Sequence, residues 1–275
     1  MKETISMWRH TRMVILTALA AAIYAAVLIP FKAGIPIFPG VTEVRPANAL
    51  PPVFGLMFGP AGAWGAAIGN TIGDIFGGGL GLGTFFGFIG NFYLGFVVYK
   101  LWGAIGLVAR DDATPNVNSW RKLVAYAVVA ITASVACAVI IAWGLDLVGL
   151  VPFAFLAVVI SLNNTVTSLL LGPPLLLVLY PRVKKMGLLW TELMSPAEVG
   201  SGFARHFGAA VMLAGTWGGL LAGLGVATGV HGQQILKLTA GNLQKAGTCL
   251  SVLPFLVAMV VAGFMLSGRE QFTEE

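Results

Sequence analysis

Long apolar runs recur along the chain, and several of them approach 20 residues without a charged side chain, the first being Met13 to Phe31. A run of that length matches a helix that crosses the roughly 30 Å hydrocarbon core of a bilayer. Charged residues make up only 10% of the 275 residues, against about 25% in soluble globular domains. Because the backbone polar groups of a spanning segment must be satisfied internally, we expect an all-α integral membrane protein.

The breaks between the apolar runs predict eight helices. We expect them at residues 12–31, 47–58, 60–77, 83–109, 121–144, 151–180, 207–228 and 247–267. The chain should reverse direction at Gly59-Pro60, because the residue before a proline disfavours helix. The first six helices form one expected bundle within residues 1–185. Residues 186–275 are expected to form an amphipathic connector and a two-helix transmembrane hairpin.

Lysine and arginine set the expected orientation. With a reversal at Gly59-Pro60, most of them, including Arg121 and the Lys184-Lys185 pair, fall on the same side as the N-terminus. Lys and Arg accumulate on the cytoplasmic side of a membrane. We therefore expect a multi-pass protein of the cell membrane whose N- and C-termini are both cytoplasmic. No basic cluster with interleaved aromatic residues suggests a nucleic-acid partner.

Polar residues interrupt the apolar pattern in the segment 41–79, which contains Glu43, Arg45, Asn70 and Asp74. An ionisable group at the centre of a membrane helix costs about 2.5–3.5 kcal/mol, so such groups mark sites lined by protein or water. Asn70 and Asp74 are four residues apart and share a helix face. Asp74 could pair with an internal cation, and Arg45 could pair with Glu43 or with Asp74. The alternative is that these residues bind a polar solute.

A polar stripe crosses the expected sixth helix. Ser161, Asn164, Thr165 and Ser168 follow the spacing i, i+3, i+4, i+7 and therefore lie on one face. Hydrogen bonds between membrane helices average about 0.6 kcal/mol, and the stripe could serve only to hold helices together. Contact with a ligand is the other interpretation.

Two polar residues of the expected fourth helix, Asn91 and Tyr93, stand among several phenylalanines. An aromatic wall with a few placed polar groups suits a flat heterocyclic ligand. The alternative is that most of these phenylalanines face lipid.

Alanines repeat every four residues in the first helix, at Ala18, Ala22 and Ala26 and again at Ala21 and Ala25. Faces of small residues let membrane helices approach closely. The repeat indicates either packing within the bundle or a surface that contacts another membrane subunit.

No catalytic set is present: the sequence lacks HExxH, GxSxG and a Walker motif. We therefore expect no enzyme activity, no metal site and no cofactor. The two cysteines, Cys137 and Cys249, lie in separate apolar runs and are predicted to be buried thiols.

The order of these features resembles a known family. The alanine-rich first helix, the following loop, the short helix ending in Phe58-Gly59-Pro60 and the glycine-rich helix GAWGAAIGNTIGDIFGG are similar to the S component of energy-coupling factor (ECF) transporters. The run TEVRPANALPPVFGLMFGP most resembles the queuosine-precursor branch of that family. The resemblance covers about residues 12–185.

The resemblance implies a subunit that captures a micronutrient, such as a vitamin or a nucleobase-like precursor. Its partners would be a transmembrane coupling (T) subunit, two cytoplasmic ATPases and the lipid bilayer. The alanine face would contact the coupling subunit, and the loop over residues 32–46 would close over the ligand. The two C-terminal helices depart from the six-helix pattern of the family.

Two functions remain open at this point. The first is the substrate-binding subunit of an ECF-type ABC transporter. The second is a stand-alone secondary transporter of a small polar solute, with Asp74 as its proton or ion site. An intramembrane enzyme is a third class, and no set of nucleophile and base favours it.

Overall fold

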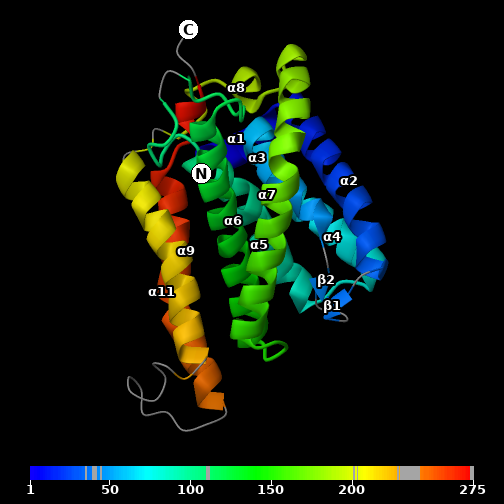
Figure 1. Ribbon diagram of the computed structural model, residues 1–275, viewed down its shortest axis with the longest axis vertical. Coiled ribbons are helices and arrows are strands. Elements are labelled where there is room, and N and C mark those ends of the chain that lie inside the picture. Colours follow the sequence, from blue (N-terminus) through cyan, green and yellow to red (C-terminus); the bar gives the residue numbers. More distant parts are fainter. Residues whose placement is uncertain are drawn as a thin grey trace.

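The computed structural model describes residues 1–34, 36–38, 42–43, 45–109, 112–200, 202, 204–227, 229 and 242–272. Six helices within these ranges are long and apolar enough to cross a membrane. They confirm the prediction of an all-α integral membrane protein. Figure 1 shows them side by side along the long axis, with α1 (Lys2–Ser6) and α8 (Trp190–Leu193) toward one end and a small β ribbon toward the other.

The elements follow one another in a simple order. They are α1 (Lys2–Ser6), η1 (Met7–Arg9), α2 (Thr11–Gly34), β1 (Pro36–Phe38), β2 (Thr42–Glu43), η2 (Pro46–Ala49), α3 (Leu50–Phe58), α4 (Pro60–Gly77), α5 (Leu82–Leu101), α6 (Trp120–Leu147), α7 (Phe153–Lys185), α8 (Trp190–Leu193), α9 (Arg205–Ala227), α11 (Asn242–Met265) and η4 (Arg269–Gln271). Strands β1 and β2 pair antiparallel, with Pro36 opposite Glu43.

The chain reverses direction at Gly59, as the sequence predicts. Gly59 has φ +53°, and a Cβ placed on Gly62 would lie 2.3 Å from the carbonyl oxygen of Phe54. The backbones of α3 and α4 therefore touch directly beyond the turn. Glycines 65, 69 and 73 of α4 meet successively later residues of α2, which shows that α2 and α4 run parallel. Two parallel neighbours require a reversal between them.

Helix α3 fills only part of the membrane depth. Its nine residues rise about 14 Å, less than half of the hydrocarbon core, and every one of them is buried. Neither α3 nor α4 is among the six helices that qualify as spans by length and composition. The irregular backbone before α3 is tolerated because protein rather than lipid surrounds it.

The expected end of the fourth helix is wrong. We expect helix over 83–109, whereas α5 ends at Leu101. The carbonyls of Gly103 and Ala104 accept hydrogen bonds from Arg205 and His206 of α9 instead of continuing the helix. These partners lie about 100 residues further along the chain, so the local pattern could not reveal them.

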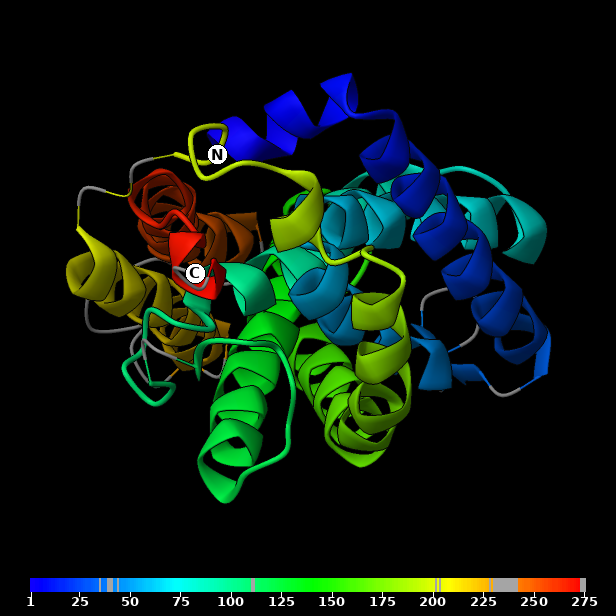
Figure 2. The same cartoon turned by 90° about the horizontal axis from the view of Figure 1, so that it is seen from above.

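The last two long helices form an antiparallel pair beside the bundle. Gly208 of α9 packs on Met265 of α11, and Gly215 packs on Met259. The pair contacts α6 and α7. Viewed along the long axis, α9 and α11 lie at one edge of the molecule and α2 lies at the opposite edge (Figure 2).

Candidate functional site

The first part of the candidate site is a chain of polar contacts from η2 to α4. Arg45 immediately precedes η2, and its Nη1 donates to Oδ1 of Asn70 at 3.2 Å. Asn70 in turn donates through Nδ2 to Oδ2 of Asp74 at 3.1 Å. Gly87 of α5 leaves room for this contact, because a Cβ there would lie 2.9 Å from Asn70 Nδ2. A cation and an anion are thus joined through one buried amide.

The second part is centred on Asn48 of η2. Its Nδ2 donates to Oδ1 of Asn164 at 2.5 Å, and its carbonyl oxygen accepts from Ser168 Oγ at 3.2 Å. The hydroxyl oxygen of Tyr24 lies 2.5 Å from Asn48 Oδ1 and 3.0 Å from Asn91 Oδ1. All five of these side chains are buried. The cluster ties η2 to α2, α5 and α7 near the middle of the bundle.

The polar stripe of α7 carries hydrogen-bonding capacity that the rest of the described chain does not use. Ser161 Oγ and Asn164 Nδ2 are buried and have no hydrogen-bond partner among the described residues. An unsatisfied buried polar group costs about 1–3 kcal/mol. Asn163, beside them, accepts from the backbone N–H of Arg45 at 3.3 Å. Two orphan groups next to a charged residue are an arrangement that a polar ligand would complete.

The structure brings most of the predicted binding residues together. Arg45, Asn70 and Asp74 form one string, and Asn91, Asn164 and Ser168 belong to the cluster around Asn48. Ser161 and Thr165 are half-buried on the same stripe of α7. The side chain of Glu43 lies outside what the structure describes.

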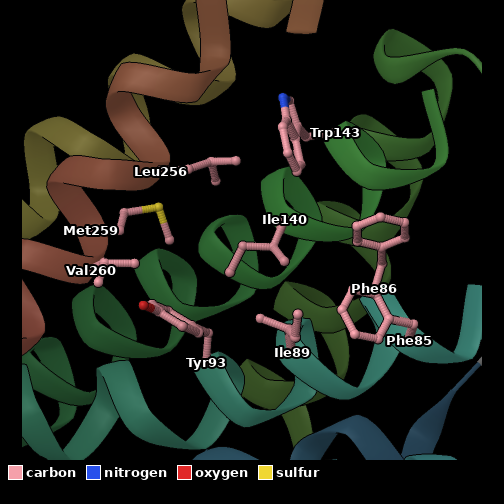
Figure 3. Close-up of a pocket in the computed structure, with 9 residues that line it drawn as sticks. All are labelled: Phe85, Phe86, Ile89, Tyr93, Ile140, Trp143, Leu256, Met259 and Val260. Carbon is pink, nitrogen blue, oxygen red and sulfur yellow. The ribbon is translucent and has the colours of Figure 1, made fainter. Parts of the chain in front are cut away.

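Tyr93 lies apart from the polar cluster. Its ring contacts Phe92 and Phe96, and it lines an apolar groove together with Trp143 and Met259 (Figure 3). Tyr93 and Asn91 are two residues apart in α5 and therefore lie on different faces of the helix. The structure therefore does not bring Tyr93 to the polar residues with which we grouped it.

Three residues of the cluster escape the sequence analysis: Tyr24, Asn48 and Asn163. Asn48 had a visible signal, because it is an amide three residues after Arg45 at the edge of an apolar segment. Tyr24 had none, since a tyrosine in an alanine-rich helix is equally suited to the membrane interface. Only the packing of α2 against η2 reveals its partners.

The two alanine repeats of α2 face opposite ways. Ala21 and Ala25 are buried, and the backbone of Ala21 closely approaches Gly69 of α4. Ala18, Ala22 and Ala26 are exposed. Four large apolar side chains share this outer side of the helix, namely Ile15, Leu19, Ile23 and Val27. The predicted contact face is thus not used for packing within the described chain.

A buried helix of nine residues, with polar side chains gathered around its start, defines a multi-pass membrane protein built around a small internal polar site. The family model described as "QueT transporter" matches residues 14–181. The chain belongs to the QueT transporter family, which comprises ECF S components for queuosine precursors. The resemblance seen in the sequence is confirmed, and the family is one of transporters rather than enzymes. Neither the curated proteins nor the solved structures gave a match.

Proposed function

We propose that this chain is the membrane-embedded substrate-binding subunit of an ECF-type ABC transporter, taking up a queuosine precursor or a similar nucleobase-like micronutrient. The observation that carries the proposal is the polar cluster around the half-length helix α3. Membrane transporters place substrate sites near the midplane, at the ends of discontinuous helices. The family match supports a transported solute of this class.

The chemistry of the cluster suits a flat ring that carries amide groups. Each asparagine side chain offers both a donor and an acceptor, and asparagines approach the site from η2, α4, α5 and α7. Arg45 and Asp74 add one charge of each sign. Ser161 Oγ and Asn164 Nδ2 supply groups that the described chain leaves unused. A nucleobase-like solute presents complementary donors and acceptors in one plane.

We assign the partners from the outer face of α2. Ala18, Ala22 and Ala26 would contact the transmembrane coupling subunit, which two cytoplasmic ATPases would drive. The exposure of these alanines and their small size support a helix–helix contact there. From the positive-inside rule we infer that the end of the bundle that carries α1 and α8 faces the cytoplasm, and that both chain termini are cytoplasmic. We also propose a domain boundary near residue 185, close to the end of the family match.

The binding site is tested with purified protein and a queuosine precursor. Equilibrium binding should weaken about tenfold in Asn164→Ala and in Asp74→Asn, because each removes about one charge-assisted or buried hydrogen bond worth roughly 1–2 kcal/mol. Ser134→Ala is the matched control: within the described part of the chain, its buried hydroxyl donates to the carbonyl of Ala130 in its own helix α6 and to no residue of the site. Unchanged affinity in both site variants would remove this pocket from the proposal.

The partner assignment is tested by co-purifying the chain with its coupling subunit and ATPases. Ala22→Trp on the outer face of α2 should reduce recovery of the complex while leaving binding of the precursor intact. Val158→Trp, at an exposed position of α7, should reduce neither. Uptake into liposomes by the chain alone, driven by an ion gradient, would favour the secondary transporter over the ECF subunit.

A further inference from the structure

An apolar groove lies where the C-terminal helix pair meets the bundle (Figure 3). Its cavity has a volume of about 210 Å³. The lining residues are Phe85, Phe86, Ile89 and Tyr93 of α5, Ile140 and Trp143 of α6, and Leu256, Met259 and Val260 of α11. The groove shares no residue with the hydrogen-bonded cluster around Asn48. It is a separate feature of the molecule.

The groove spans about one leaflet of the bilayer. Phe85 lies in the first turn of α5, at the end of the bundle that carries the β ribbon. Tyr93 is eight residues further on, a rise of about 12 Å. Half of the hydrocarbon core is about 15 Å. The groove therefore extends from the ribbon side of the membrane to near its middle.

The floor of the groove is closed and its mouth is open. Ile140 and Met259 are 7% and 1% exposed, whereas Phe85 and Val260 at the mouth are 60% and 45% exposed. The indole N–H of Trp143 is already used, because it donates to the carbonyl of Cys249 at 3.0 Å. The lining thus offers hydrocarbon contacts and almost no hydrogen bonds.

Size decides between the candidate occupants. An α-helix with its side chains is about 10–12 Å wide, so even one turn of it occupies more volume than a cavity of about 210 Å³ offers. A dry apolar cavity of about 150 Å³ holds a molecule as large as benzene. A slender hydrocarbon chain therefore fits where a protein segment does not, and the surrounding bilayer is made of such chains. We propose that the groove binds one acyl chain of a phospholipid from the leaflet on the ribbon side.

A bound acyl chain would fill the groove between α5 and α11. Empty space beside apolar side chains forfeits their dispersion contacts, and a chain seated there restores them. The lipid would join the C-terminal helix pair to the bundle at the ribbon side. It does so independently of any transported solute.

A photoactivatable phospholipid with a diazirine on one acyl chain tests the site without any variant. After reconstitution in vesicles of phosphatidylethanolamine and phosphatidylglycerol, labelled peptides are mapped by mass spectrometry. We expect labelling of the groove-lining segments of α5, α6 and α11 at least tenfold above the exposed face of α7 around Val158. Equal labelling of both surfaces would overturn the proposal.

Native mass spectrometry of the same protein supplies the second measurement. Ile89→Trp fills the groove and should lower the occupancy of a retained phospholipid at least tenfold, while Val158→Trp should not change it. Val260→Phe narrows the mouth and serves as a second groove variant if the first does not purify as a folded protein. A retained lipid that all variants keep equally, or a retained molecule of another class, would contradict the assignment.

Discussion

At the scale of single residues, Asn48 holds the polar centre of the molecule together. Its amide and carbonyl groups contact side chains from α2 and α7 within 3.2 Å. At membrane depth there is no water to replace such partners. An asparagine is suited to this position because one side chain both donates and accepts. The cluster therefore fixes where η2 ends and where Arg45, three residues earlier, enters the site.

Tyr24 serves two acceptors with one proton. A hydroxyl can donate to either Asn48 Oδ1 or Asn91 Oδ1 but not to both at once. Tyr24→Phe removes the proton from both and should lower the free energy of unfolding by about 1–3 kcal/mol, the cost of unsatisfied buried acceptors. Thermal unfolding of the detergent-solubilised protein measures this loss.

Tyr180→Phe is the control for that measurement. The Tyr180 hydroxyl is buried and has no hydrogen-bond partner among the described residues, so its removal should be neutral or stabilising. Equal destabilisation by the two substitutions would mean that the Tyr24 hydroxyl has no special role.

Part of this site is readable from sequence spacing. Asn70 with Asp74, and Asn164 with Ser168, are each four residues apart, and helical periodicity alone places each pair on one face. The partners across helices are not readable, because Tyr24, Asn48 and Asn164 are brought together only by tertiary packing. Tyr93 shows the converse: its aromatic neighbours suggested a ligand site, yet Tyr93 itself lines an apolar groove.

At the scale of elements, the hairpin of α3 and α4 positions the site. Gly59 joins the two helices with φ +53° and ψ −123°, a backbone conformation that residues other than glycine rarely adopt. The reversal lets a half-length helix begin inside the bundle and end at the side of α8. Arg45 and Asn48 are thereby held at mid-depth rather than at the membrane surface.

Gly59→Ala should therefore destabilise the protein. The backbone strain alone costs about 1–3 kcal/mol, and the new Cβ would lie 2.5 Å from Cδ2 of the Trp190 ring. Gly83→Ala in α5 is the matched control, since the nearest atom of the described residues to a Cβ there is Cδ2 of Leu145, at 3.9 Å. Unfolding curves for both variants should separate clearly. Similar curves would show that the turn tolerates a side chain.

The element boundaries show where local patterns reach their limit. The end of α3 is foreseeable because proline and glycine act on their immediate neighbours. The end of α5 is not, because Arg205 and His206 of a distant helix bond the carbonyls of Gly103 and Ala104, just beyond the last residue of α5. Apolar composition continues beyond Leu101, and composition alone therefore extends the expected helix too far.

At the scale of the whole molecule, one buried lysine fastens the C-terminal helix pair to the bundle. Lys100 Nζ of α5 lies 2.5 Å from Oε1 of Glu3 and donates to the carbonyl of Leu266 at 2.6 Å. Neither Lys100 nor Glu3 has an exposed side chain. These contacts, called here the Lys100 node, join α1, α5 and the end of α11. Helix α2 stays uncovered at the opposite edge of the molecule (Figure 2). The added helices thus leave the alanine face accessible.

Burial makes this node sensitive to the loss of one partner. Lys100→Met would remove the closer of the two positive charges on the buried Glu3 carboxylate and leave the N-terminal ammonium at 3.3 Å and the Tyr99 hydroxyl as its partners. Breaking a buried ion pair typically costs about 3–5 kcal/mol, and the remaining ammonium should keep the loss toward the lower end. Lys184→Met, at an exposed position at the end of α7, should change stability by less than about 0.5 kcal/mol. Unfolding of the purified variants measures the change in stability. Limited proteolysis of the segment after Lys185 measures how firmly the C-terminal helix pair is attached.

The double variant Lys100→Met with Glu3→Gln separates charge from packing. With both Glu3 and Lys100 uncharged, it should recover part of the stability lost in Lys100→Met, because the under-compensated carboxylate causes most of that loss. Recovery should remain incomplete, since the carbonyl of Leu266 still lacks its donor. If the double variant is less stable than Lys100→Met, an under-compensated carboxylate is not the cause of the loss, and Glu3 instead stabilises the protein through its contacts with the N-terminal ammonium and Tyr99.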